Sequence, residues 1–387
     1  MSWFARTQLA WHVLRKEKPR LLVAIIGIAF ANLLILMQLG FKGALFYSCG
    51  RLHRSFQGDL CLVNPHFETL ISPQSFSREL LFRCQALPEV ERVQGVKVGL
   101  TPWRNPVNGR TRSIQVVGFD PGFPMIRDPD VAAQADQLKT LGNVLFDRLG
   151  RPEFGPIEEL FRASPFPIET EVNRKKVQVA GLFSMGASFA ADGCILMSED
   201  TFRMVFPDTR RAEVEFGFVF LRPQSDIEAV QVQLQSMIGE AAQVLTRAQM
   251  EKLEEDYWAN STGIGFIFAM GAAMGFMVGV VIVYQVLHSD ISDHLPQYAT
   301  LKAMGYSNAF LLLTLAQESL LLALLGYGPG LGLSMFLYKQ ASEATALPLF
   351  MTPERAVGVF AATVAMCMIS DAIAARKLTS ADPADIF

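Results

Sequence analysis

Charged residues are scarce in this chain, and the short motifs that mark the commonest enzymes are missing. Of 387 residues only 18% are charged, against about 25% in soluble globular proteins, while 51% are hydrophobic. The dipeptide Gly-Lys never occurs, which excludes a phosphate-binding P-loop, and neither HExxH nor GxSxG is present. Five histidines are scattered without ligand spacing. The sequence therefore predicts no catalytic residues, no metal site and no cofactor bound by this chain.

The net charge and the cysteine pattern also exclude some classes of partner and site. The net charge is only −3 and no basic, aromatic-laced patch is seen, so we expect no nucleic-acid partner. The five cysteines contain no CxxC pair, which argues against a zinc or redox motif. Their odd number and wide spacing do not dictate a disulfide, and that question stays open at this stage.

What the chain has instead is four long apolar runs, at residues 21–41, 263–287, 309–337 and 356–375. About 20 apolar residues in a helix span a hydrocarbon core roughly 30 Å thick. The runs contain only two charged residues, Glu318 and Asp371. Buried helices of a soluble protein rarely reach this length without charge, and the first run is too long for a cleaved signal peptide. We predict four transmembrane helices with an α+β extracytoplasmic domain inserted between helices 1 and 2.

The charges before the first run predict the orientation. Arg6, Arg15, Lys16, Lys18 and Arg20 precede it, and the positive-inside rule places them in the cytoplasm. Four spans return the C-terminus to that side, so the large domain is expected outside. Residues 1–20 are interpreted either as an interfacial helix in contact with membrane lipid or as a plain cytoplasmic extension of the first span.

The predicted organisation follows from these spans. It comprises a cytoplasmic or interfacial segment 1–20, span one with a stalk 21–57, an outer domain 58–245, a stalk with span two 246–287, a cytoplasmic coupling loop 288–308, span three 309–338, a short outer loop 339–355, span four 356–375 and a cytoplasmic tail 376–387.

Two stalks are expected to carry the outer domain. Leu45, Cys49, Leu52 and Phe56 recur at helical spacing beyond span one. On the return side, residues 246–249 fit a capping box, which predicts a helix start. We expect both stalks to be helices continuous with spans one and two. Within the domain, strands are predicted at residues 59–64, 90–98, 113–118, 176–183, 193–197 and 214–221, and helices at 75–87 and 227–238.

Inside the spans, three features are candidates for function or packing. Gly271, Gly275 and Gly279 form a bare face on span two, which indicates a close helix–helix seam, either intramolecular or between two copies. Pro329 predicts a kink or break in span three. Glu318 is an ionisable group inside a span, so it marks a proton or substrate path or a structural hydrogen bond to a neighbouring helix.

The loop 288–308 contains an apolar stripe at helical spacing. Pro296 suits a first helical turn and Gly305 a helix stop, so a short helix is predicted near 296–304. Such a helix can lie flat and offer its stripe to a partner, or it can be an ordinary surface helix in a connecting loop. The stripe consists of Ile291, Leu295, Tyr298, Leu301 and Met304.

Several stretches of the chain resemble a known family. They are Asp290-Ile291 followed by PQYATLKAMGY at 296–306, VYQ at 283–285, QES at 317–319, and residues 39–41, 51–60, 148–156, 177–183, 186–193 and 376–387. They resemble the FtsX/MacB permease superfamily, and over nearly the whole chain its DevC-type branch. Gln297 departs from the branch, which tends to carry Glu there.

The resemblance implies an inner-membrane permease subunit of a tripartite ABC exporter, with a MacB/FtsX-like fold. It implies a homodimer that works with a separate DevA-like ATPase, which binds ATP and Mg²⁺, a DevB-like periplasmic adaptor and a TolC-like channel. The implied cargo is a glycolipid, as in the cyanobacterial heterocyst envelope. An alternative is an FtsX-like regulator of a periplasmic hydrolase; a sensory receptor is a remote reading. The residues implied in coupling to the ATPase are Asp290, Ile291, Leu295, Tyr298, Leu301, Lys302, Met304 and Gly305.

Overall fold

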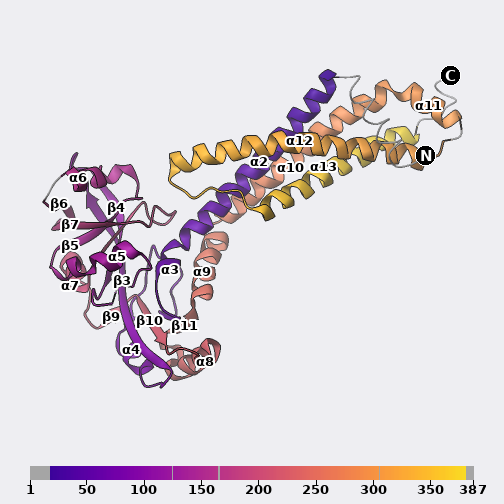
Figure 1. Cartoon of the computed structure of the whole chain (residues 1–387). Coiled ribbons are helices and arrows are strands. Elements are labelled where there is room, and N and C mark those ends of the chain that lie inside the picture. Colours follow the sequence, from indigo (N-terminus) through magenta and orange to yellow (C-terminus); the bar gives the residue numbers. More distant parts are fainter. Residues whose placement is uncertain (1–17, 124, 164–165, 305, 381–387) are drawn as a thin grey trace. The chain divides into compact units, whose positions relative to one another are not determined.

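The computed structural model describes residues 18–123, 125–163, 166–304 and 306–380 (Figure 1). These residues form two compact units. A helical unit is built from the described parts of Met1–Ala44, Ile264–Ala344 and Leu349–Phe387. A sheet-containing unit comprises Leu45–Gly263 together with Thr345–Pro348. Nearly all of the predicted segment 1–20, and the end of the tail 376–387, lie outside the described residues.

Four long helices make up most of the helical unit. They are α2 (Lys18–Cys49), α10 (Ile264–Asp293), α12 (Asn308–Thr345) and α13 (Pro353–Ser380), and the short helix α11 (Leu295–Ala303) connects α10 to α12. Each of the four is long and apolar enough to cross a membrane, which confirms the four predicted spans. The short helix predicted near 296–304 is confirmed as α11.

The long helices pack around a shared apolar core. Ile28 of α2, Leu287 of α10, Leu315 of α12 and Met366 of α13 are at most 1% exposed. Polar groups inside the bundle find partners on other helices. The hydroxyl of Thr363 on α13 donates to the amide oxygen of Asn32 on α2 at 2.6 Å, and both residues are fully buried.

The break predicted at Pro329 is not found. Helix α12 continues from Asn308 to Thr345 with the proline inside it. One residue after the proline, a methyl group built on Gly330 would lie only 2.9 Å from the carbonyl oxygen of Ala29, so α12 is packed closely against α2 here. Packing against neighbouring helices commonly allows a proline inside a membrane helix.

The second unit is an α+β domain, as predicted. It contains one large sheet and a small one. Its strands are β1 (Leu60–Val63), β2 (Phe76–Ser77), β3 (Val90–Arg104), β4 (Thr111–Phe119), β5 (Asn143–Asp147), β6 (Ile168–Val172), β7 (Lys175–Phe183), β8 (Cys194–Ser198), β9 (Glu213–Val214), β10 (Phe216–Leu221) and β11 (Gln243–Thr246). The helices and helical turns are α3 (Arg51–Ser55), α4 (Glu79–Cys84), α5 (Pro129–Gln134), η1 (Ala135–Lys139), η2 (Pro152–Phe154), α6 (Ile157–Ala163), α7 (Glu199–Val205), α8 (Ile227–Ile238), η3 (Gly239–Ala241), α9 (Arg247–Asp256) and the π-helix η4 (Tyr257–Ser261).

The large sheet has nine strands in the order β11-β1-β10-β3-β4-β8-β5-β7-β6. Strand β6 also pairs with the end of β3, so β3, β4, β8, β5, β7 and β6 close into a ring. Neighbours are antiparallel except for β4–β8 and β5–β7, which are parallel. Strands β2 and β9 form a separate pair.

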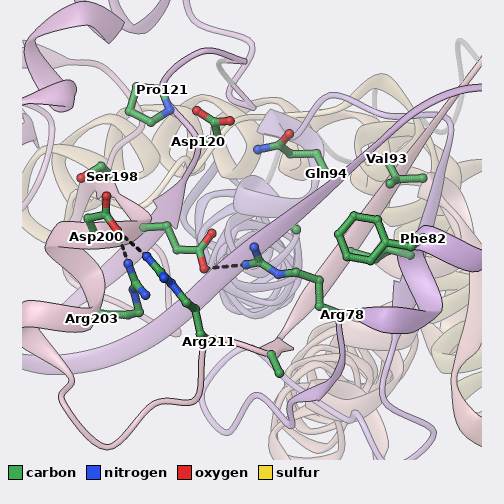
Figure 2. A pocket seen from close by; sticks show the side chains of 14 residues that line it. Arg78, Phe82, Val93, Gln94, Asp120, Pro121, Ser198, Asp200, Arg203 and Arg211 are labelled. Atoms are coloured by element: carbon green, nitrogen blue, oxygen red, sulfur yellow. Dashed lines mark hydrogen bonds and ion pairs between the residues drawn. The ribbon is translucent and has the colours of Figure 1, made fainter. Parts of the chain in front are cut away.

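Strand β3 links the two parts of this sheet. Its first half pairs with β10, and its second half, from Lys97 onward, pairs with β4. After Phe119 the chain turns away at Asp120 and Pro121, and a cleft of about 730 Å³ lies where β4 would have continued (Figure 2). The walls of this cleft come from α4, β3, the turn after β4, and α7.

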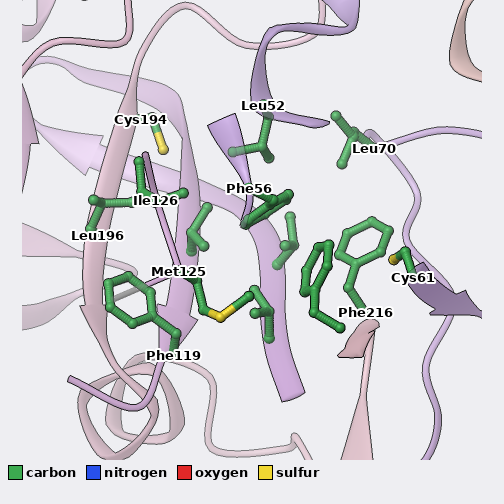
Figure 3. Close-up of a cluster of buried hydrophobic side chains, with 14 of the residues drawn as sticks. Leu52, Phe56, Cys61, Leu70, Phe119, Met125, Ile126, Cys194, Leu196 and Phe216 are labelled. Atoms are coloured by element: carbon green, nitrogen blue, oxygen red, sulfur yellow. The ribbon is translucent and has the colours of Figure 1, made fainter. Parts of the chain in front are cut away.

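Three apolar clusters hold the domain together. One packs inside the ring around Trp103 and another packs α4 and α8 against β1, β10 and β11. The third lies where α3 meets the sheet, and Figure 3 shows Leu52 of α3 and Phe56, which follows α3, in one cluster with Met125, Ile126 and Phe216. All five cysteines are buried and free, including Cys61 and Cys194 in this cluster, so no disulfide forms.

The two stalk predictions have different outcomes. Helix α2 extends to Cys49, and Gly50 keeps a right-handed helical conformation that leads into α3, with Arg54 N donating to Gly50 O at 3.0 Å. On the return side the predicted capping box is confirmed at Thr246 and Gln249, where α9 begins. The expected continuity with span two is wrong, because Gly263 has φ +69° and separates η4 from α10. Residues 45–57 and 246–263 belong to the sheet-containing unit.

Candidate functional site

The predicted coupling residues do not form one uniform stripe. Ile291 lies on α10 and is 0% exposed in the core of the bundle, whereas Met304, just after α11, is 63% exposed. Leu295 is half-buried and packs against the same core, and Lys302 is half-buried. The side chains of Tyr298 and Leu301, and the whole of Gly305, lie outside the described part of the chain.

This distribution divides the region into an inner and an outer part. Ile291 and Leu295 fasten the start of α11 to the bundle, so they are not available as a surface for a partner. The exposed side chains lie further along, at Gln297, Thr300, Met304 and Tyr306. Exposed side chains are thus found along α11 after Leu295 and in the turn that follows it.

An ion-pair network ties the start of α2 to the end of α10. Arg20 contacts Asp290 at 3.4 Å and forms a second, shorter ion pair with Asp293. Its guanidinium also donates to the hydroxyl of Ser289 at 3.4 Å. Asp290 is 7% exposed and lies 3.4 Å from the ring of His294. The predicted residue Asp290 is therefore an internal anchor of the α10–α11 junction.

The three glycines of α10 form a seam within one chain. A methyl group built on Gly271 would lie 2.6 Å from Gln38, and one on Gly275 would lie 3.0 Å from Ile35. Gly279 approaches Ala31 and also Met366 of α13. Gln38, Ile35 and Ala31 are spaced along one face of α2. The alternative that the sequence left open is thus decided: this seam joins α10 to α2.

Glycines also allow α12 to approach α2 from another side. A methyl group on Gly326 would meet Ile28 at 2.6 Å, and one on Gly330 would meet the carbonyl oxygen of Ala29 at 2.9 Å. The glycine faces of α10 and α12 therefore both pack closely against α2. Close backbone approach is the packing that small residues provide in membrane helices.

Glu318 is one of three buried acidic residues in the bundle. It is 4% exposed, and its electrostatic neighbours are Asp290 of α10 and Asp371 of α13, which are 7% and 5% exposed. Neither of these neighbours is a hydrogen-bond donor when ionised. The predicted roles for Glu318, a proton or substrate path or a structural hydrogen bond, stay predictions.

In the domain, a buried carboxylate joins the two stalk helices. Glu254 of α9 is 0% exposed and accepts hydrogen bonds from Thr69 at 2.8 Å, from the amide of Leu70 at 3.0 Å and from the indole of Trp258 at 3.0 Å. The imidazole of His53 on α3 lies 3.4 Å from its other side. This group, called here the Glu254 hub, links α3, α9, η4 and the loop after β1.

A second buried carboxylate holds the loop 184–189 against the first stalk. Asp147 accepts hydrogen bonds from the amides of Leu149, Met185 and Gly186 at 3.1, 2.8 and 2.7 Å. Burial raises its pKa, and these bonds together with the nearby guanidinium of Arg51 oppose that shift. Arg51 in turn donates to the carbonyl oxygens of residues 185 and 187, at 2.9 and 3.0 Å.

The contacts of Asp147 and Arg51 with residues 185–187 are called here the Asp147 anchor. Together with the Glu254 hub, this anchor lies next to residues 186–193, one of the stretches that resemble the known family. The segment 186–193 lies beside the stalk, where the amide of Phe189 donates to the hydroxyl of Ser48 at 3.1 Å. Phe189 also packs edge-on against Trp258 at 5.0 Å between ring centroids. Movement of either stalk helix would therefore reach the sheet through fixed hydrogen bonds and not through a loose tether.

The cleft beside β3 has a volume of about 730 Å³ and is lined by side chains of the domain. Arg78 at the start of α4 reaches Glu199 of α7 at 2.6 Å, while Arg203 and Arg211 share the carboxylate of Asp200 (Figure 2). The full lining is Arg78, Leu81, Phe82, Val93, Gln94, Gly95, Asp120, Pro121, Ser198, Glu199, Asp200, Arg203, Arg211 and Ala212. Among the described residues, no group of three His, Cys, Asp or Glu side chains is placed to hold a metal ion.

Sequence reasoning missed the Glu254 hub, the Asp147 anchor, the Arg20 network and the cleft. A signal existed for two of them. Glu254 lies at helical spacing from Met250 and Trp258, which makes it an acidic residue on an apolar face. Arg20 lies just before the first predicted span, and Asp290 and Asp293 lie just after the second. Both places are expected on the same side of the membrane, where opposite charges can meet.

Part of the chain is similar to a described family. Residues 269–383, from α10 through α11 and α12 into α13, match the model of the FtsX-like permease C-terminal family. The comparison with curated protein sequences gave no match.

Three solved structures resemble the chain over about half its length. The extracellular domain of the ABC-type transporter YknZ from Gram-positive bacteria is 16% identical, covers 49% of this chain and 99% of its own, and has a TM-score of 0.34. The periplasmic region of MacB from Actinobacillus actinomycetemcomitans is 10% identical, with 51% and 92% covered and a TM-score of 0.34. A permease-protein domain from Porphyromonas gingivalis is 16% identical, with 49% and 90% covered and a TM-score of 0.31. Scores this low carry no argument by themselves.

Proposed function

We propose that this chain is the membrane permease subunit of an ABC-type transporter of the FtsX/MacB kind, one that transmits movement instead of enclosing a transport channel. The observation that carries the proposal is the match of residues 269–383 to the FtsX-like permease C-terminal family. The arrangement of four membrane-capable helices with a large domain between the first and second supports it.

The finer proposal is a DevC-type subunit. In it, a homodimer of this chain works with two copies of a separate cytoplasmic ATPase, a periplasmic adaptor and a TolC-like channel, and exports a glycolipid or similar amphiphile. The domain is then periplasmic and both termini are cytoplasmic. ATP and Mg²⁺ bind to the ATPase subunit, since this sequence contains no P-loop.

The proposed mechanism uses fixed contacts within each of the two units. The ATPase would push on the exposed side chains of α11 and on Met304. Ile291, Leu295 and the Arg20–Asp290 ion pair would pass the movement into the bundle. The seam at Gly275 binds α10 tightly to α2, so the two helices move together. In the domain, the Glu254 hub and the Asp147 anchor would carry the movement of the stalks into the sheet.

The proposal is tested first by ATP hydrolysis. The purified chain in detergent should hydrolyse no ATP, and its complex with the ATPase subunit should do so. Appreciable turnover by the lone chain, free of contaminating ATPase by mass spectrometry, would contradict a permease role.

A second measurement separates the exporter from the regulator. Co-purification from membranes with an adaptor and an outer-membrane channel supports the exporter, whereas stoichiometric co-purification with a periplasmic peptidoglycan hydrolase supports an FtsX-like role.

A further inference from the structure

The cleft beside β3 contains a length of unpaired strand edge. Residues of β3 before Lys97 pair with β10 on one side only, because β4 departs after Phe119. An open strand edge presents backbone donors and acceptors at the spacing of another strand, and proteins normally cover or blunt such edges. The rest of the long strand β3, from Lys97 to Arg104, has β4 on this side.

The register shows which backbone groups face the cleft. Asp59 N donates to Val219 O at 3.0 Å, so the peptide groups of Val219 point toward β1, and those of its neighbour Phe218 point toward β3. Phe218 is opposite Gln94, so the N–H and C=O of Gln94 bond to β10. Those of Val93 and Gly95 then point the other way, into the cleft.

A second contact gives the same register independently. The amide of Val98 donates to the carboxylate of Glu215 at 3.1 Å, on the β10 side. Even-numbered residues here therefore face β10, and odd-numbered ones face β4 or the open edge. Val93, Gln94 and Gly95 all line the cleft, as expected of a cavity that lies against an edge and not against one face.

The walls of the cleft suit an extended peptide. Phe82 of α4 is 61% exposed and lines the cleft together with Val93 (Figure 2), which provides an apolar contact for one side chain. The charged residues of the lining balance, with Arg78, Arg203 and Arg211 against Asp120, Glu199 and Asp200. Arg203 and Arg211 share the carboxylate of Asp200. The ion pair between Arg78 and Glu199 crosses from α4 to α7.

We propose that this edge is a docking site for a short extended segment of a partner protein, which adds as a strand beside Val93–Gly95. Backbone hydrogen bonds to Val93 and Gly95 supply most of the affinity. An apolar side chain against Phe82 supplies selectivity. The site is a property of the domain and stands whether or not the chain is a permease.

Amide hydrogen exchange of the full chain in nanodiscs tests the open edge directly. Without peptide, the amides of Val93 and Gly95 should exchange much faster than that of Gln94. The probe is the tightest-binding peptide selected from a displayed library of random octapeptides. When it binds, exchange at Val93 and Gly95 should slow while Gln94 is unchanged. Protection of Val93 and Gly95 before peptide is added, failure to select a binder, or binding without new protection would each overturn the proposal.

Proline substitution supplies matched variants. Val93→Pro removes an N–H that faces only the cleft, so it should weaken peptide binding by roughly tenfold, as for one lost backbone hydrogen bond. Val93 also packs against the apolar cluster of α4 and α8, so the unfolding temperature of Val93→Pro should match that of Val93→Ala, which loses the same packing. Val93→Ala keeps the N–H and should bind like the wild type. Gln94→Pro should lower the unfolding temperature, because that N–H belongs to the ladder with β10.

Two further measurements distinguish this site from a general apolar surface and from self-association. Phe82→Ala should weaken binding, while Phe166→Ala, which removes a 75% exposed ring elsewhere on the domain, should not. If Val93→Pro instead changes the oligomeric state of the chain in the absence of peptide, the edge pairs with a second copy, and the partner-peptide proposal is wrong.

Discussion

Glu254 illustrates how a buried carboxyl group is accommodated when hydrogen-bond donors surround it. Its two oxygens receive hydrogen bonds from Thr69, Leu70 and Trp258, with the ring of His53 on the remaining side. A buried carboxylate without such donors would be strongly unfavourable. The residue therefore holds two helices and a loop in one arrangement.

The first prediction concerns this residue. Glu254→Gln replaces one acceptor oxygen by an NH₂ group that faces existing donors, so it should cost about 1–3 kcal/mol of unfolding free energy. Near-UV circular dichroism during denaturant unfolding of the full chain, where Trp258 reports on the hub, measures the loss. Glu251→Gln is the matched control, because its ion pair with Arg54 is partly exposed and is worth about 1 kcal/mol or less. Equal losses for the two variants would contradict the hub.

A second prediction at this scale concerns Asp147 and pH. Burial raises its folded pKa above the ordinary value of 3.8, so the folded protein retains a proton that the unfolded chain has released. This group therefore favours folding at low pH, and its contribution falls as pH rises from 3.8 through the folded pKa. Asp147→Asn should remove that decline.

The same substitution leaves one of three amides without an acceptor, at a cost of about 1–3 kcal/mol at neutral pH. The measurement is the unfolding temperature of wild type and variant between pH 4 and pH 8. A difference between the two proteins that does not change with pH would show that Asp147 does not titrate in this way.

At the scale of elements, the packing of α10 against α2 depends on the absence of side chains. A methyl group on Gly279 would lie 2.0 Å from the sulfur of Met366 and 2.8 Å from Ala31. Gly332 on α12 has nothing within 4 Å of the same position. The two glycines differ in surroundings but not in intrinsic helix propensity.

A third prediction follows from this contrast. Gly279→Val should destabilise the bundle by about 1–3 kcal/mol through overpacking. Gly332→Val should be neutral within error, since it makes the same change in helix propensity without the clash. Thermal unfolding of the two variants in one detergent compares them, and a similar loss in both would show that propensity and not packing dominates.

Elements were predicted best where a local signal sufficed. The capping box at Thr246 and Gln249 marked the start of α9, and the Pro296 and Gly305 signals marked α11. The predicted helix 75–87 is partly wrong, because Phe76 and Ser77 pair with β9 as strand β2 before α4 begins. Strands β5, β6 and β11 were missed because each is short and becomes a strand only through partners distant in sequence.

For the whole molecule, the chain passes between the two compact units at four places, at the two stalks and at both ends of Thr345–Pro348. The two stalk connections differ. Helix α2 belongs to both units, whereas the return connection passes through Gly263, whose left-handed conformation ends the helix. If movement passes between the units, α2 is the stiffer connection.

The fourth prediction concerns transmission through the molecule. Met304→Glu places a charge on the exposed turn after α11, where the ATPase is proposed to push. It should leave assembly intact and separate ATP hydrolysis from export, so that hydrolysis continues while export falls. Met237→Glu, a charge on a partly exposed methionine of α8, is the control and should export normally. Normal export by Met304→Glu would show that α11 is not the coupling element.

The sequence by itself determined the four membrane-capable helices, the inserted domain and the short helix between α10 and α12. Those features depend on hydrophobic length and local capping, which are properties of neighbouring residues. It also singled out Gly271, Gly275 and Gly279 as a packing face and Glu318 as an ionisable group in a span.

Only the tertiary structure decided what these features meet. In it, the glycine face of α10 packs against α2, and Ile291 and Asp290 are buried in the bundle. Glu254 lies in contact with His53, which is 201 positions away in the chain. The backbone groups of Val93 and Gly95 have no neighbouring strand on one side, because β4 turns away before it reaches them. The partner of a residue is set by long-range packing, and no local pattern in the sequence records it.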